Sequence, residues 1–380
     1  MTHETRASVA GGLPRPMAQL PVDRACGDLP LFIGTYNHPG DWFTAHGDGL
    51  LSCRFNVHTG EIRLRHTFSD LRNPCYLDWS TDGRLLAATD HFMEPGGLHA
   101  FAVGTDGTLE RLSVADAQGQ AVCHVCGRGN GVVYVPSYMD SRLTVHPLSP
   151  DGQLAEATQL FRYPGSGPHR QRQTSSHPHQ AVLSPDGRHL YVPDLGADRI
   201  HIHAVEVDGG LGLARTIALA AGSGPRHLVF HPSLNLAYLV GELDGVIRVL
   251  ERDTGHGQLR LLASCPTTLS AEPSAAAIHL HPSGRVLAIS ERSDSTLCFF
   301  SVADDGSLSF AGRFPAGGQT PREFAFDPTG QWLLVGCQDS DRVTVHALDP
   351  RLGVPLQIAG EFPCGSPVCL LFSQPDLPVS

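Results

Sequence analysis

The sequence predicts an all-β protein, a seven-bladed β-propeller, and three observations lead to this prediction. Short apolar runs that end in turn signals fill the chain, whereas the helical periodicity of about 3.6 residues is hard to find. The 41 glycines and 29 prolines are spread evenly, as tight turns between many short strands require. One pattern also recurs along the chain: an inner strand, a Pro-Asp-Gly type turn and a second strand.

The turn proline of the repeat marks its period. Thr81 holds the same place two periods before the first of these prolines, and residues 123–148 supply a degenerate unit between the two. One sheet of this kind cannot bury both of its faces, so neighbouring units stack and the series closes radially. The prolines, spaced by 47, 50 and 46 residues, are Pro185, Pro232, Pro282 and Pro328.

Counting the first strands of the repeat gives seven blades. Residues 365–372 begin the seventh first strand, and residues 32–37 resemble a second strand without a first. We therefore expect the N-terminal strand to complete the last blade. We also expect one propeller domain over residues 31–375 and a flexible tail, rich in Ala, Gly and Pro, over residues 1–30. The seven first strands are placed at Pro74, Cys123, His179, Arg226, Ala276, Arg322 and Val368.

Composition and charge exclude several classes of protein. The formal charge of −11, from 27 Lys and Arg against 38 Asp and Glu, argues against a nucleic-acid partner, which needs a basic surface. No apolar run approaches the roughly 20 residues of a membrane span, and the N-terminal segment lacks the apolar core of a secretory signal. The ten cysteines are scattered rather than arranged as a disulfide framework, so we expect a reduced, cytoplasmic protein.

Two rings of side chains are expected at one mouth of the central channel. In an antiparallel hairpin the start of the first strand lies beside the end of the second, so residues at these two places gather. Guanidiniums recognise carboxylates and phosphates, and a histidine titrates near neutrality. The rings therefore predict a site for a small-molecule anion that contains an acid/base pair. The charged and polar members are His179, Arg226, Glu242, Arg292, Arg322 and Gln338.

Further candidates lie beside these residues. Tyr138 belongs to the ring formed by the ends of the second strands. His91 holds the equivalent position in the unit that contains the string TDHFMEPGG, and we interpret this unit as lacking the usual acidic residue at the end of its second strand. The polar loop over residues 165–179 leads into the site and offers Arg172 to grip an anion. The alternative to a ligand site is a structural network in which the arginines and Glu242 neutralise each other.

The sequence indicates neither a cofactor nor a metal. It contains no Gly-x-Ser-x-Gly elbow, Walker loop or dinucleotide fingerprint. His177 and His179 share one strand face and could chelate a metal, but a third ligand is not evident nearby. A calcium site would need several oxygen ligands, whereas the rings offer one carboxylate among several positive charges.

Several strings of the chain resemble one protein family. They are GTYN, NPCYL, HPHQAVLSPDGRHLYVPDLGADR, GSGPRHLVFHP, VGELDG, QTPREFAFDPTG and QDSDRV, and together they span roughly residues 31–372. They look like the motifs of the seven-bladed propeller lactonases, which include 6-phosphogluconolactonases and fungal carboxy-cis,cis-muconate cyclases. The resemblance implies a metal-independent site that opens a sugar lactone or forms a muconolactone. It assigns that site to His179, Arg226, Glu242 and Arg292, with Arg322 and Gln173 as further matches.

The resemblance and the charged rings lead to one leading hypothesis, the hydrolysis of 6-phosphogluconolactone to 6-phosphogluconate. Either His179 or Glu242 would activate water while the other protonates the leaving ring oxygen, and Arg226 would stabilise the oxyanion. The alternatives are cycloisomerisation of a carboxymuconate and a non-catalytic anion-binding or scaffold propeller; a calcium-dependent gluconolactonase ranks last. The expected substrate-binding residues are Arg172, Gln173, Tyr138, Arg292, Arg322 and Gln338.

Overall fold

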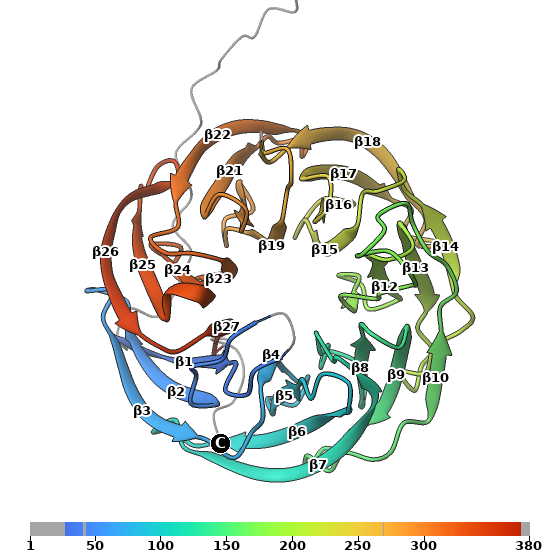
Figure 1. Ribbon diagram of the computed structural model, residues 1–380, viewed down its shortest axis with the longest axis horizontal. Coiled ribbons are helices and arrows are strands. Elements are labelled where there is room, and N and C mark those ends of the chain that lie inside the picture. The colour runs from blue at the N-terminus through green and yellow to red at the C-terminus, as the bar shows by residue number, and fades with distance from the viewer. Residues whose placement is uncertain (1–26, 41–42, 269, 374–380) are drawn as a thin grey trace, which may run out of the picture.

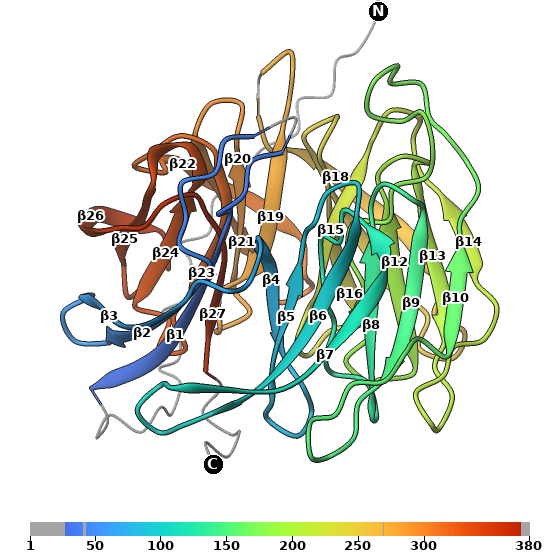
Figure 2. The ribbon, with the colours of Figure 1, turned by 60° about the horizontal axis from the view of Figure 1, so that its bottom comes forward.

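The computed structural model describes residues 27–40, 43–268 and 270–373, which form seven β-sheets arranged in a ring (Figure 1). Each sheet has one strand at the centre of the ring and its last strand at the rim, so the sheets are the blades of a propeller. Figure 2 shows the same blades standing side by side in an oblique view. The predicted all-β, seven-bladed fold is confirmed.

The blades are numbered along the chain, and their strands are given from the channel outward. Blade 1 consists of β4 (Pro74–Trp79), β5 (Leu85–Thr89), β6 (Pro95–Val103) and β7 (Leu109–Gln120). Blade 2 has three strands, β8 (Val132–Ser137), β9 (Arg142–Pro147) and β10 (Gln159–Arg162). Blade 3 consists of β11 (Val182–Leu183), β12 (His189–Asp194), β13 (Arg199–Ala204) and β14 (Arg215–Ala218).

The remaining blades have four strands each. Blade 4 consists of β15 (Pro225–Phe230), β16 (Leu236–Gly241), β17 (Val246–Arg252) and β18 (Leu259–Pro266). Blade 5 consists of β19 (Ala275–Leu280), β20 (Val286–Glu291), β21 (Thr296–Val302) and β22 (Leu308–Pro315). Blade 6 consists of β23 (Pro321–Phe326), β24 (Trp332–Cys337), β25 (Arg342–Leu348) and β26 (Pro355–Pro363), with the short helix η1 (Gln338–Ser340) after β24. Blade 7 consists of β27 (Pro367–Phe372), β1 (Asp28–Thr35), β2 (Leu50–Asn56) and β3 (Ile62–Phe68).

Blade 7 joins the beginning and the end of the described chain in one sheet. Its inner strand β27 pairs antiparallel with β1, so that Leu31 faces Phe372 and Ile33 faces Leu370. In Figure 1 the blue β1 accordingly lies beside the dark red β27. Strand β1 begins at Asp28, three residues before the predicted domain boundary, and residues 1–26 of the predicted tail lie outside the described residues.

Adjacent blades pack against each other through buried side chains that recur from blade to blade. Three tyrosines, one in the middle of each of β8, β12 and β16 in blades 2, 3 and 4, are fully buried. A buried tyrosine needs a partner for its hydroxyl, and each one donates a hydrogen bond to a glycine carbonyl of the next blade. The pairs are Tyr134 to Gly209 at 2.7 Å, Tyr191 to Gly257 at 2.6 Å and Tyr238 to Gly306 at 2.9 Å.

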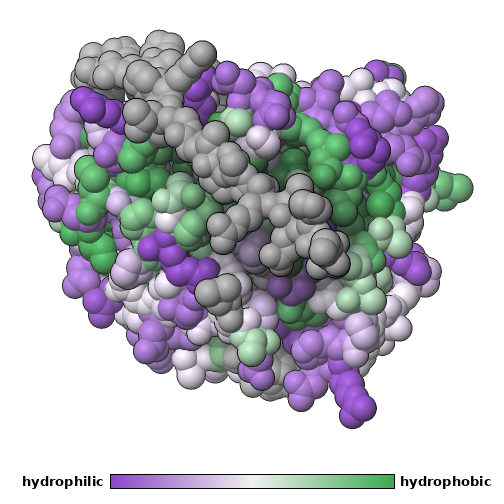
Figure 3. All heavy atoms as spheres, turned by 90° about the horizontal axis from the view of Figure 1, so that it is seen from above, coloured by the Kyte–Doolittle hydropathy of each residue, from purple (hydrophilic) through white to green (hydrophobic). Residues whose placement is uncertain are grey.

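The outer strands carry exposed apolar side chains on part of the rim. Leu261 and Leu262 on β18 and Phe310 on β22 are exposed. Figure 3 shows hydrophobic side chains gathered on this side of the molecule. In the part of the chain that the structure describes, no helix is long and apolar enough to cross a membrane.

Candidate active site

One mouth of the central channel opens into a cavity of about 1210 Å³. Its lining comes from the starts of the first strands, the ends of the second strands and the loops beside them, as the two predicted rings require. All of the predicted site residues except Gln173 contribute to this lining. They are Tyr138, Arg172, His179, Arg226, Glu242, Arg292, Arg322 and Gln338.

A β-bulge positions the arginines at the starts of the first strands. In blade 4 the ladder passes from Pro225 to His227 while the partner strand advances by one residue, so Arg226 is the extra residue of a bulge. Arg322 occupies the same place in blade 6, between Pro321 and Glu323. Because a bulge re-aims a side chain that regular pleating would direct elsewhere, it explains how these arginines reach the mouth of the channel.

Glu242 lies at the centre of the arginine cluster. Its side chain is 1% exposed and forms ion pairs with Arg172 at 2.6 Å, Arg226 at 3.1 Å and Arg292 at 3.1 Å. Burial alone raises the pKa of Glu242, but the guanidiniums of Arg292, Arg172 and Arg226 more than reverse this effect and hold that pKa well below its usual value. Glu242 is therefore an anion that fixes three guanidiniums rather than a strong base.

Arg226 is the most deeply buried of these guanidiniums, with 3% of the side chain exposed. Burial and the nearby charge of Arg292 lower the pKa of Arg226 to about 10, although Glu242 acts in the opposite direction. The side chain still carries a full charge at neutral pH. A buried guanidinium with other positive charges nearby is suited to stabilising a negative charge that develops beside it.

His179 presents a neutral imidazole to the same cavity. The residue is 6% exposed, and burial together with the charge of Arg226 lowers the pKa of His179 well below its usual value. Its ring lies edge-on to Tyr138, with ring centroids 5.7 Å apart. The segment that carries His179 is held by Asp194 at the end of β12, which accepts hydrogen bonds from the His177 amide at 2.7 Å and the Ser176 hydroxyl at 2.6 Å. A neutral histidine fixed in this way offers an unprotonated ring nitrogen to the cavity at neutral pH.

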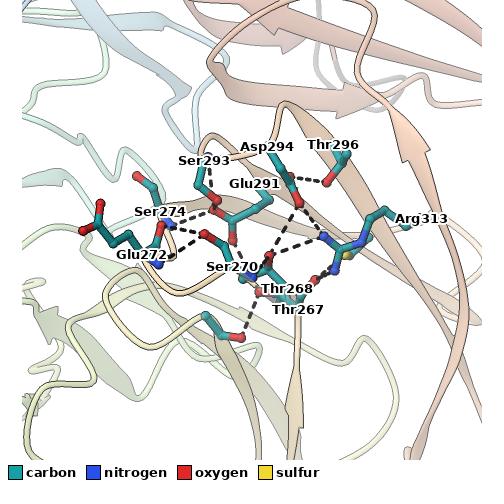
Figure 4. Close-up of polar contacts among 12 residues, drawn as sticks. Thr267, Thr268, Ser270, Glu272, Ser274, Glu291, Ser293, Asp294, Thr296 and Arg313 are labelled. Atoms are coloured by element: carbon teal, nitrogen blue, oxygen red, sulfur yellow. Dashed lines mark hydrogen bonds and ion pairs between the residues drawn. The ribbon is translucent and has the colours of Figure 1, made fainter.

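Arg292 is held by an equivalent carboxylate in blade 5, drawn in Figure 4. Glu291, at the end of β20, is fully buried and accepts hydrogen bonds from the Ser274 amide at 2.6 Å and the Ser293 hydroxyl at 2.9 Å. The Ser274 carbonyl in turn accepts a hydrogen bond from Nε of Arg292 at 3.1 Å. The residue before the cavity arginine thus fixes the loop against which its guanidinium rests.

Gln173 does not reach the cavity, so its predicted contact with substrate does not fit its position. The residue is 1% exposed, and its amide nitrogen donates hydrogen bonds to the Leu195 carbonyl and to Asp198, both at 2.8 Å. Its amide oxygen accepts a hydrogen bond from the His169 backbone at 3.1 Å. Gln173 therefore braces the loop from which the neighbouring Arg172 reaches Glu242.

Arg322 differs from the other cavity arginines because it makes no ion pair with any described residue. Its guanidinium donates a hydrogen bond to the Tyr36 hydroxyl at 3.2 Å and lies over the Tyr36 ring, 5.4 Å from the ring centroid. The positive charge of Arg322 is thus positioned without being neutralised by a carboxylate, which leaves it available to an anionic ligand.

An aromatic wall, which consists of Tyr36, Phe43 and Phe92, lines the part of the cavity next to Arg322. The Tyr36 and Phe43 rings are stacked with centroids 4.2 Å apart, and Phe92 meets Phe43 edge-on at 6.3 Å. Tyr36 directly follows β1 and so holds the second-strand ring position of blade 7, whereas no pattern in the sequence indicated the two phenylalanines. They lie in loops that are longer than the equivalent loops of blades 2 to 6, so an alignment of the repeats gives no equivalent position for them.

Asp90, rather than His91, occupies the second-strand ring in blade 1. The ring position is the residue that directly follows the second strand, as Glu242 follows β16, and β5 ends at Thr89. Asp90 lines the cavity, and burial raises the pKa of its carboxyl. The interpretation that this unit lacks its acidic residue was therefore wrong by one position. Placing the ring one residue after the last apolar strand position would have found Asp90.

The cavity thus holds more negative charge than the sequence indicated. Its lining contains the carboxylates of Asp90, Glu242 and Asp339 together with four arginines. Within the described ranges of the chain, no group of three or more His, Cys, Asp or Glu side chains is placed to hold a metal ion. Positive charge still dominates the part of the cavity around Glu242.

The chain matches a known family along nearly all of its described length. The profile of the family described as "Lactonase, 7-bladed beta-propeller" matches residues 30–372. The chain is 26% identical over 347 residues to a 6-phosphogluconolactonase of Bacillus subtilis, which covers 90% of this chain and 97% of the relative. It is 29% identical over 336 residues to a 6-phosphogluconolactonase of Formosa agariphila, covering 85% of this chain and 93% of the relative.

A solved structure shares both the fold and part of the sequence. The periplasmic gluconolactonase of Pseudomonas aeruginosa superimposes with a TM-score of 0.82 at 30% identity, over 91% of this chain and 99% of that protein. The similarity therefore extends over the whole ring of blades and is not limited to a few of them.

Proposed function

Because the chain belongs to the seven-bladed β-propeller lactonase family, we propose that it hydrolyses 6-phosphogluconolactone to 6-phosphogluconate. Two relatives that carry the name 6-phosphogluconolactonase support this substrate. The observation that carries the proposal is the cluster of Glu242 with three guanidiniums beside the neutral imidazole of His179. This cluster offers an anion site and a base within one cavity.

The anionic group of the substrate binds to the arginines that Glu242 leaves partly unneutralised. One carboxylate cannot neutralise the charge of Arg172, Arg226 and Arg292, and Arg322 has no ion pair among the described residues. A phosphate can accept two hydrogen bonds from one guanidinium in a fixed geometry. The phosphate therefore sits between Arg292 and Arg322, with Arg172 at the edge.

His179 acts as the general base in this proposal. It takes a proton from a water molecule as the water oxygen attacks the lactone carbonyl, and Arg226 stabilises the negative charge that forms on the carbonyl oxygen. The carbon–oxygen bond of the ring then breaks, and the protonated His179 returns its proton to the leaving ring oxygen. The products are a hydroxyl group and a carboxylic acid, which loses its proton to solvent. The carboxylate of Glu242 is engaged by three guanidiniums, so it serves as the fixed counter-charge and not as the base.

The aromatic wall receives the uncharged face of the lactone ring. One face of a sugar ring presents mainly C–H groups, which pack favourably on aromatic side chains such as Phe43 and Phe92. With the anion on the arginines and the ring on this wall, the lactone carbonyl is directed toward His179 and Arg226. The two parts of the cavity thus divide substrate binding between them.

The proposal is tested by assaying purified His179→Gln and Arg226→Lys proteins with 6-phosphogluconolactone at neutral pH. Each change is expected to lower kcat by about 10²- to 10³-fold, because the first removes the base and the second removes the preorganised oxyanion donor. His256→Gln and Arg260→Lys, which change exposed residues, are the matched controls and should keep full activity.

The same assay decides between the proposal and its rivals. A plain aldonolactone and a carboxymuconate are assayed in parallel, with and without a chelator. If only the carboxymuconate is turned over, the function is cycloisomerisation and not lactone hydrolysis. If these compounds bind but none is turned over, the protein is an anion-binding propeller. Full activity in folded His179→Gln and Arg226→Lys proteins would remove these residues from the mechanism.

We further propose that the protein works in the cytoplasm. The nine cysteines of the described residues are all free, which suits a reducing compartment. The similar protein of Pseudomonas aeruginosa is periplasmic, so the proposal needs its own measurement. Fractionation of the source cells tests this proposal. We expect the protein in the soluble cytoplasmic fraction, and recovery with periplasmic proteins would contradict the proposal.

A further inference from the structure

A second ring of side chains lies directly beneath the cavity. It consists of the residues that follow the first-strand ring, and three of its members meet across the channel: Tyr76 of blade 1, His124 of blade 2 and His227 of blade 4. The His124 ring centroid lies 3.9 Å from that of Tyr76 and 5.9 Å from that of His227. Below this ring, Tyr76 and His124 line a second cavity of about 820 Å³. His227 lines neither cavity and is enclosed between them.

His227 makes a hydrogen bond with the guanidinium of Arg226. Nη1 of Arg226 donates to Nε2 of His227 at 3.4 Å, while Nε of Arg226 faces Glu242 at 3.1 Å. Burial, followed by the charge of Arg226, holds the pKa of His227 well below its usual value, so the Nε2 lone pair stays available as an acceptor. An ion pair with Glu242 and a hydrogen bond to His227 thus hold the same guanidinium.

Arg226 needs this second acceptor because its surroundings repel it. The positive charges of Arg292 and Arg322 act on Arg226, and Arg226 shares the carboxylate of Glu242 with Arg172 and Arg292. With 3% of its side chain exposed, Arg226 has little access to solvent water as an alternative partner. Removing the imidazole acceptor would leave one edge of a buried guanidinium unsatisfied, and the group would turn away from its present position.

His227 also packs against the proposed base. The His179 and His227 rings meet edge-on with centroids 5.2 Å apart, and the rings of His124 and Tyr76 also pack beside His227, with centroids 5.9 and 6.2 Å away. The imidazole of His227 therefore contacts Tyr76 and His124 of the second ring as well as His179 and Arg226 of the proposed active site.

We propose that His227 is a positioning residue for lactone hydrolysis, and that its Nε2 holds Arg226 in the orientation that stabilises the oxyanion. This inference rests on the proposed function. His227 does not touch the substrate, and the phosphate is held by Arg292, Arg322 and Arg172. Losing the acceptor should therefore lower kcat and leave KM nearly unchanged.

The test compares His227→Gln with His227→Met. The two side chains have similar length and volume, but only glutamine offers an oxygen that can accept the hydrogen bond of Arg226. Steady-state kinetics with 6-phosphogluconolactone give kcat and KM, and calorimetric titration with inorganic phosphate measures the anion site without turnover. The same pair of changes at His124, which contacts His227 but makes no hydrogen bond with Arg226, controls for altered packing of the second ring.

His227→Met is expected to lower kcat by about tenfold or more, because small misplacements of a catalytic group cost about that much, while His227→Gln restores most of it. KM and phosphate affinity should change by less than about threefold in both proteins. The glutamine and methionine variants at His124 should be equally active. Equal kcat values for His227→Gln and His227→Met, whether both high or both low, would overturn the role of Nε2. A wild-type protein that binds phosphate but opens no lactone would instead overturn the proposed function.

Discussion

The two parts of the cavity are built in different ways. Arg226, Glu242, Arg292 and Arg322 stand on strand bulges and strand ends that recur in every similar blade. The aromatic wall of Tyr36, Phe43 and Phe92 depends on the loops after β1 and β5, which are longer than the four-residue loops at the same place in blades 2 to 6. The repeat thus supplies most of the charge of the site, whereas the longer loops supply its shape.

Hydrogen bonds hold the Phe92 part of the aromatic wall in an unfavourable backbone conformation. Phe92 adopts a left-handed backbone conformation, with φ at 65°, which is uncommon for a residue with a large side chain. Its amide donates a hydrogen bond to Asp90 at 2.7 Å, and its carbonyl accepts one from Ala121 at 2.8 Å. Backbone contacts to two neighbours therefore hold the conformation that directs the Phe92 ring to the cavity.

The largest expected effect comes from removing the central charge of the arginine cluster. Glu242→Gln should lower the free energy of unfolding at pH 7 by about 3–5 kcal/mol, because it leaves buried guanidiniums without their counter-charge. Urea unfolding measures this loss. Glu251→Gln, which changes an exposed pair with Arg260, is the control and should cost about 1 kcal/mol or less.

The same variant also changes how stability depends on pH. The pKa of Glu242 is lower in the folded protein than its usual value of 4.5, so its contribution is complete above that value and is lost as the pH falls through the folded pKa. Glu242→Gln should flatten this part of the acid-unfolding curve. An unchanged curve below pH 4.5 would show that the charge of Glu242 does not support the arginine cluster.

A smaller effect is expected in the aromatic wall, and it should appear in a different kinetic constant. Phe92→Ala should raise KM for 6-phosphogluconolactone by roughly fivefold, corresponding to about 1 kcal/mol of lost ring contact, and leave kcat nearly unchanged. Phe310→Ala, on the exposed rim, is the matched control. If kcat fell by a larger factor than KM rose, the aromatic wall would orient the lactone carbonyl for reaction. The proposal that the wall contributes only to substrate binding would then be wrong.

The smallest change tests how tightly the wall is packed. A methyl group on Gly40 would lie 2.7 Å from a ring carbon of Phe43 and 3.1 Å from one of Phe92, so Gly40→Ala must displace these rings. We expect KM to rise about twofold to threefold, since only ring contacts are weakened. Gly360→Ala, where an added methyl group meets no atom within 4 Å, should leave KM unchanged. Identical KM values for the two variants would show that the wall moves freely.

The same difference between repeat and loop explains how far the sequence could predict the site. The alignment of the repeats correctly predicted that His179, Arg226 and Glu242 line one cavity, because residues at equivalent strand positions meet at one end of a propeller. The alignment failed by one residue at Asp90, where the irregular loop after β5 obscured the end of the strand. It could not find Phe92, because the path of a loop depends on tertiary contacts that leave no periodic trace in the sequence.

The family resemblance had a different weakness. It indicated Gln173 as a substrate contact, since the residue lies six positions before His179 in a shared string. A shared string, however, does not distinguish a residue that touches the ligand from one that supports the loop. The hydrogen bonds of Gln173 to Leu195 and Asp198 show that it supports the loop.

The pairing of β1 with β27 has a consequence for biosynthesis. When a ribosome has made blades 1 to 6, β1 has long since emerged, but its partner strand does not yet exist, so one edge of β1 stays open. Tyr36, which directly follows β1 and binds Arg322, is then not yet anchored on the closed ring. The open edge of β1 therefore remains able to pair with another chain until β27 is translated. The cavity is complete only after β27 has paired with β1.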